Sequence, residues 1–275
     1  MMSEPESMNH ERLENDSEVP GSSREMNRAP PVIPFRDPTG SLHAMKWESH
    51  RQTGRTALIP DRYYGLWPDG FVFYELDEIT SETVLETRTI EPLIQEAMEE
   101  FENYTCIRFL KRNGNPNINN YLFIRGDAIG CWSYMGMNEL GPQDLSIEMG
   151  QCDRKGIIMH ELMHSLGFYH EHVRFDRDEY VKVHWENISP GREEEFYAVT
   201  LNDSQDLGVE YSFESIMHPE LTVFTGNGRL TLEPIGEWAG TDPGPLWAKG
   251  RLAPSDIVQI DRLYECSDDG SSTRS

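Results

Sequence analysis

The sequence has no long apolar run, no excess of basic charge and no closely spaced cysteines. No stretch approaches the roughly 20 apolar residues that a membrane-spanning helix requires, so we expect no membrane span. The formal net charge of −24 disfavours nucleic acid and anionic lipid surfaces as partners, because both attract Lys and Arg. Without a C-x-x-C pair, the cysteines do not match a structural zinc site or a redox-active dithiol.

Two disulfides are the expected use of the four cysteines, and the sequence leaves three pairings open. The cysteines are Cys106, Cys131, Cys152 and Cys266. The first ten residues show no basic region followed by an apolar run, so no export signal is visible. Three residues stand in the Asn-x-Ser/Thr pattern of glycosylation acceptors, namely Asn103, Asn187 and Asn202. The missing export signal and the expected disulfides disagree about the compartment, and the disulfides carry more weight because they form in oxidising environments. We therefore predict a secreted protein, and we expect it to be a monomer.

The composition changes near residue 56. Residues 1–55 are rich in Ser, Glu, Asn, Pro and Arg without apolar periodicity, which is typical of a flexible segment. We expect a folded domain over residues 56–266 and a disordered Ser/Asp-rich tail over residues 267–275. Within the domain, strand patterns and one amphipathic helix come first, a second helix follows, and mostly irregular chain comes last. This order predicts an α+β fold.

Several segments show the periodicity of regular structure. Phe71–Leu76 has the aromatic and β-branched residues of a strand. Apolar residues recur at helical spacing from Ile90 to Phe101, with Thr89 as a possible cap. The closing segment Pro254–Tyr264 is also helical in pattern, with Ser255 as its predicted cap. Further strands are expected at residues 106–110, 121–125, 130–134 and 145–149, and a further helix at about residues 156–166.

The segment from His160 to Glu171 carries the chemistry of the chain. His160 and His164 are four residues apart, so one helical face brings both imidazoles to one metal ion, with Glu161 beside them. Gly167 can end the helix in the left-handed conformation and turn the chain so that His170 supplies a third nitrogen. Three protein ligands leave one coordination position open, as in a catalytic zinc site.

A His-x-x-x-His pair alone on an apolar helix is more often a packing feature than a metal site. Here the glutamate, the glycine and the third histidine each meet a separate geometric requirement of a zinc site. The extended pattern with a downstream Met-turn is the metzincin signature, and residues 215–218, Ser-Ile-Met-His, supply such a turn. We therefore predict one Zn²⁺ per chain.

With further landmarks, this pattern resembles the astacin family of zinc metalloendopeptidases. The local match continues through Arg174 and Asp176 to Val181. Other landmarks stand at residues 66–68, 104–109, 130–134 and 263–266, so the resemblance spans about residues 56–266. It implies a metzincin-like catalytic domain of two subdomains. The first would hold a mixed twisted sheet and the active-site helix, and the second would be mostly irregular with one terminal helix.

The resemblance implies roles for the residues of the motif. His160, His164 and His170 would bind zinc, and a zinc-activated water would attack the peptide bond. Glu161 would act first as general base and then as general acid. Met217 would lie beneath the ligands as a hydrophobic floor.

Residues outside the motif also acquire roles from the resemblance. Trp132 and Ser133 would belong to the edge strand that binds protein or peptide substrates in extended form. The family pairing of the cysteines would join Cys106 to Cys266 and Cys131 to Cys152.

An activation step is implied as well. Astacin zymogens are cut where Arg55 and Thr56 stand, so residues 1–55 resemble a propeptide, and Glu171 would receive the freed amine of Thr56. The family's Phe-x-Gly-Asp inhibitory motif has no clear match. Its nearest counterpart is Phe35-Arg36-Asp37, with Asp37 as the candidate zinc-blocking ligand.

One position departs from the family. Astacins usually carry a tyrosine two residues after the turn methionine, as a ligand at rest and as a donor to the transition-state oxyanion, and this chain has Pro219. Proline can fill neither role, so the alternative function is an activity-impaired, metalloprotease-like binding module.

The resemblance also implies a basic pocket for an acidic substrate residue. Lys249 or Arg251 would supply this pocket, or else be an ordinary ion-pair partner.

Overall fold

The structure, a computed structural model, describes residues 34–36, 42–44, 57–58, 64–77, 90–200, 204–205 and 207–266. The predicted cleavage site between Arg55 and Thr56, the candidate ligand Asp37 and the tail 267–275 lie outside the described residues. The same holds for the predicted cap Thr89 and the glycosylation acceptor Asn202. Among the described residues, no helix is both long enough and apolar enough to cross a bilayer.

A five-stranded mixed sheet forms one side of the molecule. Its strand order is β6 (Arg108–Lys111), β5 (Phe71–Leu76), β7 (Leu122–Arg125), β10 (Gln143–Ile147) and β8 (Cys131–Ser133). The first four strands are parallel to their neighbours, and β8 pairs antiparallel with β10. Leu122 and Ile124 are fully buried, because alternate side chains of a strand face the core. The predicted mixed sheet is confirmed, with β8 at its edge.

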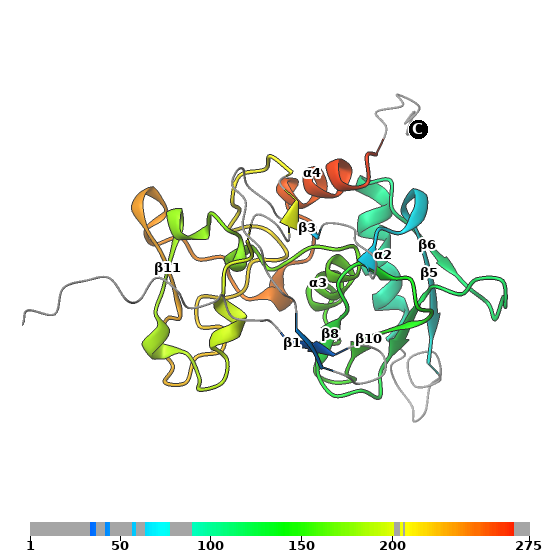
Figure 1. Cartoon of the computed structure of the whole chain (residues 1–275), viewed down its shortest axis with the longest axis horizontal. Helices are drawn as coiled ribbons and strands as arrows, with labels where there is room; N and C mark the ends of the chain where they lie inside the picture. Colours follow the sequence, from blue (N-terminus) through cyan, green and yellow to red (C-terminus); the bar gives the residue numbers. More distant parts are fainter. Residues whose placement is uncertain are drawn as a thin grey trace, which may run out of the picture.

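Two helices pack against each other in the main core. α2 (Glu91–Tyr104) buries a stripe formed by Ile94, Ala97, Met98 and Phe101, which is the spacing expected of an amphipathic helix. α3 (Lys155–Ser165) has eight of its eleven residues buried and lies near the centre of the molecule in Figure 1. A side chain carried by α3 is therefore held by packing on nearly every side.

The chain after α3 contains little regular structure. β11 (Val181–Val183) and β13 (Leu232–Pro234) form an antiparallel pair, and short 3-10 helices and loops make up most of the rest. These segments enclose a second apolar cluster that includes Phe196, Tyr211 and Phe213. In Figure 1 this part lies on the opposite side of α3 from the sheet. The predicted second, mostly irregular subdomain is confirmed.

The closing helix α4 (Pro254–Leu263) returns to the first subdomain, where Ile260 and Leu263 join the main core. The prediction that Ser255 caps this helix is wrong. Ala253 is the cap residue, and its N–H donates to Asp256 Oδ2 at 2.9 Å. Because Pro254 takes the first helical position, the carboxylate two residues later is the group that reaches back to the free N–H.

The remaining elements are short. The other strands are β1 (Pro34–Arg36), β2 (Leu42–Ala44), β3 (Ala57–Leu58), β4 (Tyr64–Gly65), β9 (Met137–Asn138) and β12 (Ser204–Gln205). The 3-10 helices are η1 (Pro68–Gly70), η2 (Glu171–Val173), η3 (Arg177–Glu179), η4 (Trp185–Asn187), η5 (Glu193–Phe196), η6 (Gly236–Trp238) and η7 (Leu246–Ala248). The strands pair as β1 with β2, β3 with β12 and β4 with β9, all antiparallel.

Two disulfides brace the domain. One joins Cys106, just before β6, to Cys266, just after α4. The other joins Cys131 on β8 to Cys152, just before α3. This is the pairing that the resemblance implies.

Asn187, one of the three predicted glycosylation acceptors, is only 8% exposed, and its Nδ2 donates to Leu230 O at 2.7 Å. The amide nitrogen that would carry a glycan is thus used inside the fold.

Gly156, in the first turn of α3, lies where the η7 segment crosses the helix. A Cβ on Gly156 would come within 2.3 Å of Leu246 O and 2.4 Å of Lys249 O, far inside van der Waals contact. We expect Gly156→Ala to lower the free energy of unfolding by about 1–3 kcal/mol, because the crossing backbone must move. Urea denaturation measures the change. Gly250→Ala is the matched control, since a Cβ there meets nothing within 4 Å, and equal losses in both variants would contradict the prediction.

Candidate metal centre

The predicted ligands come from α3 and from the chain just after it. His160 and His164 lie one turn apart on α3, and Gly167 ends the helix with a φ of 104°. Only glycine adopts this left-handed region without strain. The turn brings His170, the residue before η2, back to the two helical histidines.

The three imidazoles converge on one point. The Nε2 atom of His170 lies 3.1 Å from His160 Nε2 and 3.0 Å from His164 Nε2. One ligand atom from each of the three residues lies within 4.8 Å of the other two. Nitrogens that bind zinc tetrahedrally, at about 2.0–2.1 Å, are about 3.3 Å from one another. The geometry therefore fits a zinc ion held by three histidines.

The second nitrogen of each helical histidine is held by a backbone carbonyl. His160 Nδ1 lies 2.9 Å from Ile216 O, and His164 Nδ1 lies 2.8 Å from Phe168 O. A carbonyl can only accept a hydrogen bond, so both Nδ1 atoms carry the proton and both Nε2 atoms keep a lone pair for a metal. The donor set is thus oriented before any ion binds.

Burial keeps the three rings neutral. It lowers the pKa of His160 to about 3 and the pKa of His164 to about 4, and it holds the pKa of His170 well below its usual value. Metal ligation requires the neutral imidazole. At neutral pH no proton therefore competes with a metal for these nitrogens.

Glu161 lies between the two helical ligands in sequence and is 5% exposed. Burial raises the pKa of its carboxyl to about 8. A divalent cation held by the adjacent histidines would lower this pKa again, because an opposite charge favours the carboxylate. The carboxyl group is therefore suited to exchanging a proton near neutral pH.

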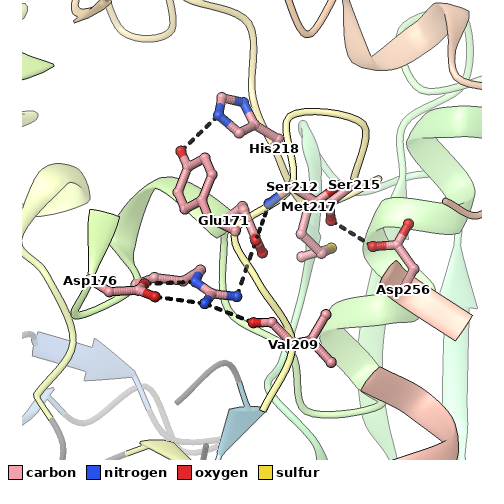
Figure 2. A network of polar contacts seen from close by, with 10 residues as sticks. Glu171, Asp176, Val209, Ser212, Ser215, Met217, His218 and Asp256 are labelled. Carbon is pink, nitrogen blue, oxygen red and sulfur yellow. Dashed lines mark hydrogen bonds and ion pairs between the residues drawn. The ribbon is translucent and has the colours of Figure 1, made fainter. Parts of the chain in front are cut away.

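The segment after the third ligand is fixed by a buried polar network. Glu171, 2% exposed, accepts hydrogen bonds from Ser212 N at 2.9 Å and from Arg174 Nη1 at 3.2 Å. Arg174 in turn donates to both carboxylate oxygens of Asp176 and to Val209 O. Figure 2 draws these hydrogen bonds as dashed lines between Glu171, Ser212, Asp176 and Val209 and the guanidinium that joins them. The predicted acid after the third ligand is thus buried, and its Oε1 atom accepts both of these hydrogen bonds.

The predicted Met-turn lies against the ligands. Met217 is 1% exposed, and its carbonyl accepts the Glu171 N–H at 2.9 Å. Its neighbour Ile216 supplies the carbonyl that holds His160. The backbone of this turn therefore contacts both ends of the ligand set.

Two landmarks of the sequence anchor the end of α3. Trp67 Nε1 donates to Ser165 O at 2.8 Å, and Tyr264 OH donates to Leu166 O at 3.0 Å. Each comes from a point 98 residues away along the chain. They satisfy carbonyls that the end of a helix leaves without intrahelical partners.

The predicted substrate-binding residues, Trp132 and Ser133, lie on β8, which has one neighbouring strand, β10, in the sheet. Both side chains are partly buried. An edge strand offers free main-chain groups to an extended peptide.

Lys249 lies against the Met-turn. Its Nζ donates to Ser215 O at 2.6 Å and to His218 O at 3.0 Å, so its charge is committed to the Met-turn. Arg251 is exposed. Pro219 is partly buried, and its carbonyl accepts the Nδ1–H of His218 at 2.7 Å.

Sequence reasoning missed Ser215 and Asp256 as parts of the centre. Ser215 Oγ donates to Asp256 Oδ1 at 2.6 Å, and both residues are fully buried. One signal was available, because Asp256 precedes Ile260 by four residues and Leu263 by seven. A carboxylate on the apolar face of a helix predicts a buried group with dedicated donors.

The chain is similar to several known proteins. The family model described as Astacin, a peptidase family, matches residues 61–265. Zinc metalloproteinase nas-6 of Caenorhabditis elegans is 38% identical over 202 residues, which cover 73% of this chain and 54% of the relative. An astacin-like metalloendopeptidase of Gallus gallus is 44% identical over 177 residues, 63% of this chain and 40% of the relative.

A solved structure supports the same placement. High choriolytic enzyme 1, a hatching enzyme zinc-protease from Oryzias latipes, superimposes with a TM-score of 0.63 at 31% identity, covering 77% of this chain and 100% of that chain. The chain spans about half or less of the length of the two curated relatives above.

Proposed function

Because the chain belongs to the astacin family of zinc metalloproteases, we propose that it is an endopeptidase that hydrolyses internal peptide bonds of extended protein segments. The observation that carries the proposal is the convergence of three histidine Nε2 atoms, together with the buried carboxyl of Glu161, the residue that follows His160 in the chain. One zinc ion held there would lower the pKa of a water molecule toward about 7 and polarise the scissile carbonyl.

The remaining steps fall to residues of the chain. Glu161 takes a proton from the attacking water and passes it to the nitrogen of the leaving chain. Trp132 and Ser133, on the edge strand β8, align the substrate through main-chain hydrogen bonds. Met217 supports the ligands from below. A protein that only binds segments has no need of a base at position 161, which favours catalysis over the binding-module alternative.

We further propose that the chain is a secreted zymogen, cut near Arg55. The burial of the chain just after that point supports this. Ala57 is fully buried, forms a β-bridge with Phe168 in the metal-binding segment, and belongs to β3, which pairs with β12. A new terminus at Thr56 would start one residue before this anchor, and Glu171 is the buried acid proposed to bind its amine. The two disulfides support secretion.

The test incubates the chain cut after Arg55 with a reduced and alkylated globular protein, and sequences the new amino termini. We expect cleavage at internal bonds, abolished by a zinc chelator. Release of terminal residues alone would contradict an endopeptidase.

Pro219 gives a prediction about the strength of catalysis. A tyrosine at this position supplies the oxyanion donor that the family usually has, and one such donor is typically worth about 10²–10³ in kcat. We expect Pro219→Tyr to raise kcat on a peptide substrate at least about tenfold. Pro219→Phe is the matched control, since it has the same ring without the hydroxyl. An equal rise in both variants, or none in either, would show that the missing hydroxyl does not limit the rate.

A further inference from the structure

The Met-turn determines which nitrogen of His160 faces the metal. His160 Nδ1 donates to Ile216 O at 2.9 Å, and both residues are buried. Because this bond uses the proton on Nδ1, the Nε2 atom of His160 keeps its lone pair, and that atom lies toward His170. The more strongly the Ile216 carbonyl accepts the Nδ1 proton of His160, the more basic the Nε2 atom of this predicted zinc ligand becomes.

That carbonyl ends a hydrogen-bond chain that begins at a carboxylate. Ile216 C=O and the Met217 N–H belong to one peptide unit, and Met217 N donates to Ser215 Oγ at 3.0 Å. Ser215 Oγ donates in turn to Asp256 Oδ1 at 2.6 Å, a bond drawn in Figure 2. In this series of hydrogen bonds, every donor points toward Asp256. The carboxylate of Asp256 thus lies at one end of the series and the imidazole of His160 at the other.

We propose that Asp256 is a positioning residue for the zinc site, acting on His160 through Ser215 and the Ile216–Met217 peptide unit. The inference rests on the proposed zinc-dependent function. Hydrogen bonds in series polarise one another in a buried site. The carboxylate makes the Ser215 oxygen a better acceptor, this polarises the peptide unit, and the Ile216 oxygen then holds the His160 proton more strongly. Carboxylates that hold a ligating histidine directly raise its basicity, and here the same effect passes through a serine and a peptide.

The surroundings of Asp256 suit a charged carboxylate. Its three partners, Ser215 Oγ, Ile216 N and Ala253 N, are all donors, at 2.6, 2.9 and 2.9 Å. The side chain also lies in the first turn of α4, where the helix dipole favours negative charge. Burial raises the pKa of Asp256 on balance, and the three donors, together with the charge of Lys249, limit that rise. Asp256 is fully buried, so water does not screen it.

A purely structural role for Asp256 predicts something different. Its bond to Ile216 N would then matter only for the shape of the turn, and any group holding the turn would have the same effect. Lys249 is such a group, because it binds Ser215 O and His218 O but takes no part in the chain of bonds to His160. Ser215→Ala, in contrast, breaks that chain and leaves the bonds of Asp256 to Ile216 N and Ala253 N in place.

The experiment compares the full-length chain with Ser215→Ala, Asp256→Asn, the double variant and Lys249→Met. Zinc affinity is measured by competition with a chromophoric chelator, and the thermal unfolding of each metal-free form is measured separately. We expect Ser215→Ala and Asp256→Asn each to weaken zinc binding about tenfold or more, as outer-shell partners of metal ligands do. The double variant should be close to Asp256→Asn alone. Lys249→Met should lower the unfolding temperature with a smaller loss of zinc affinity than Ser215→Ala.

A second readout follows the His160 Nδ1 proton by NMR in the zinc-loaded protein. Its resonance should move upfield in Ser215→Ala and move less in Lys249→Met, because Lys249 acts on Asp256 and His160 only through its charge. This comparison holds even where Asp256→Asn does not fold. Zinc affinities that simply follow metal-free stability across all variants, or an unmoved resonance in Ser215→Ala, would overturn the inference. A wild-type chain that binds no zinc would instead refute the proposed function itself.

Discussion

Glu161→Gln is expected to lower kcat for peptide hydrolysis about 10²–10⁴-fold, the usual contribution of a general acid–base group. Glutamine has nearly the same size as glutamate and cannot take up the proton of the attacking water. Because Glu161 is not one of the three converging ligands, zinc should remain bound. Initial rates on a fluorogenic peptide and the zinc content of the same sample check both parts.

Glu99→Gln is the matched control for this substitution, since Glu99 is a solvent-exposed residue on α2. Its activity should stay within about twofold of wild type, because surface substitutions seldom perturb a fold. If Glu161→Gln keeps its zinc and more than a tenth of the activity, another group takes the proton and the assigned role is wrong.

Removal of the Cys106–Cys266 disulfide should have the largest effect on stability. The two cysteines are 160 residues apart, and the chain-entropy relation assigns about 5 kcal/mol to a loop of that length. The bond also ties the end of α4 to the start of β6, so its loss should loosen the helix that carries Asp256. We expect Cys106→Ser with Cys266→Ser to lower the free energy of unfolding by about 2–5 kcal/mol, measured by urea denaturation.

The second disulfide provides the comparison. Cys131 and Cys152 are 21 residues apart, for which the same relation gives about 3 kcal/mol. Replacing this pair with serine should therefore destabilise the chain less. A larger loss from the short loop than from the long one would mean that local packing, and not loop length, determines the effect.

The sequence predicted the helical half of the centre well. Helical periodicity determines the positions of His160, Glu161 and His164. The turn after the helix is predictable from Gly167, because only glycine tolerates its φ of 104°. Such local rules need no knowledge of the rest of the chain. The strands of the sheet were predictable for the same reason, since short apolar strands stand out from the turns between them. Their mixed pairing was implied by the family resemblance and not by local pattern.

The contacts made by the C-terminal segment could not be predicted in the same way. In the sequence, Lys249 looks like an ordinary surface base. Its bonds to Ser215 O and His218 O form only because the chain returns to the Met-turn more than thirty residues after leaving it. Ser255 is a good cap by residue type, yet Ala253 is the cap residue, and the side chain of Asp256 accepts its N–H. Long-range packing decides such cases, and no local pattern records it.

The most direct test of the account is a zinc titration of the metal-free chain cut after Arg55, with hydrolysis of an unfolded protein measured at each step. We predict that activity rises in proportion to added zinc and stops rising at one equivalent per chain, while Glu161→Gln binds the same single equivalent without a comparable rise. A chain that binds one zinc and hydrolyses no faster than Glu161→Gln would contradict the account.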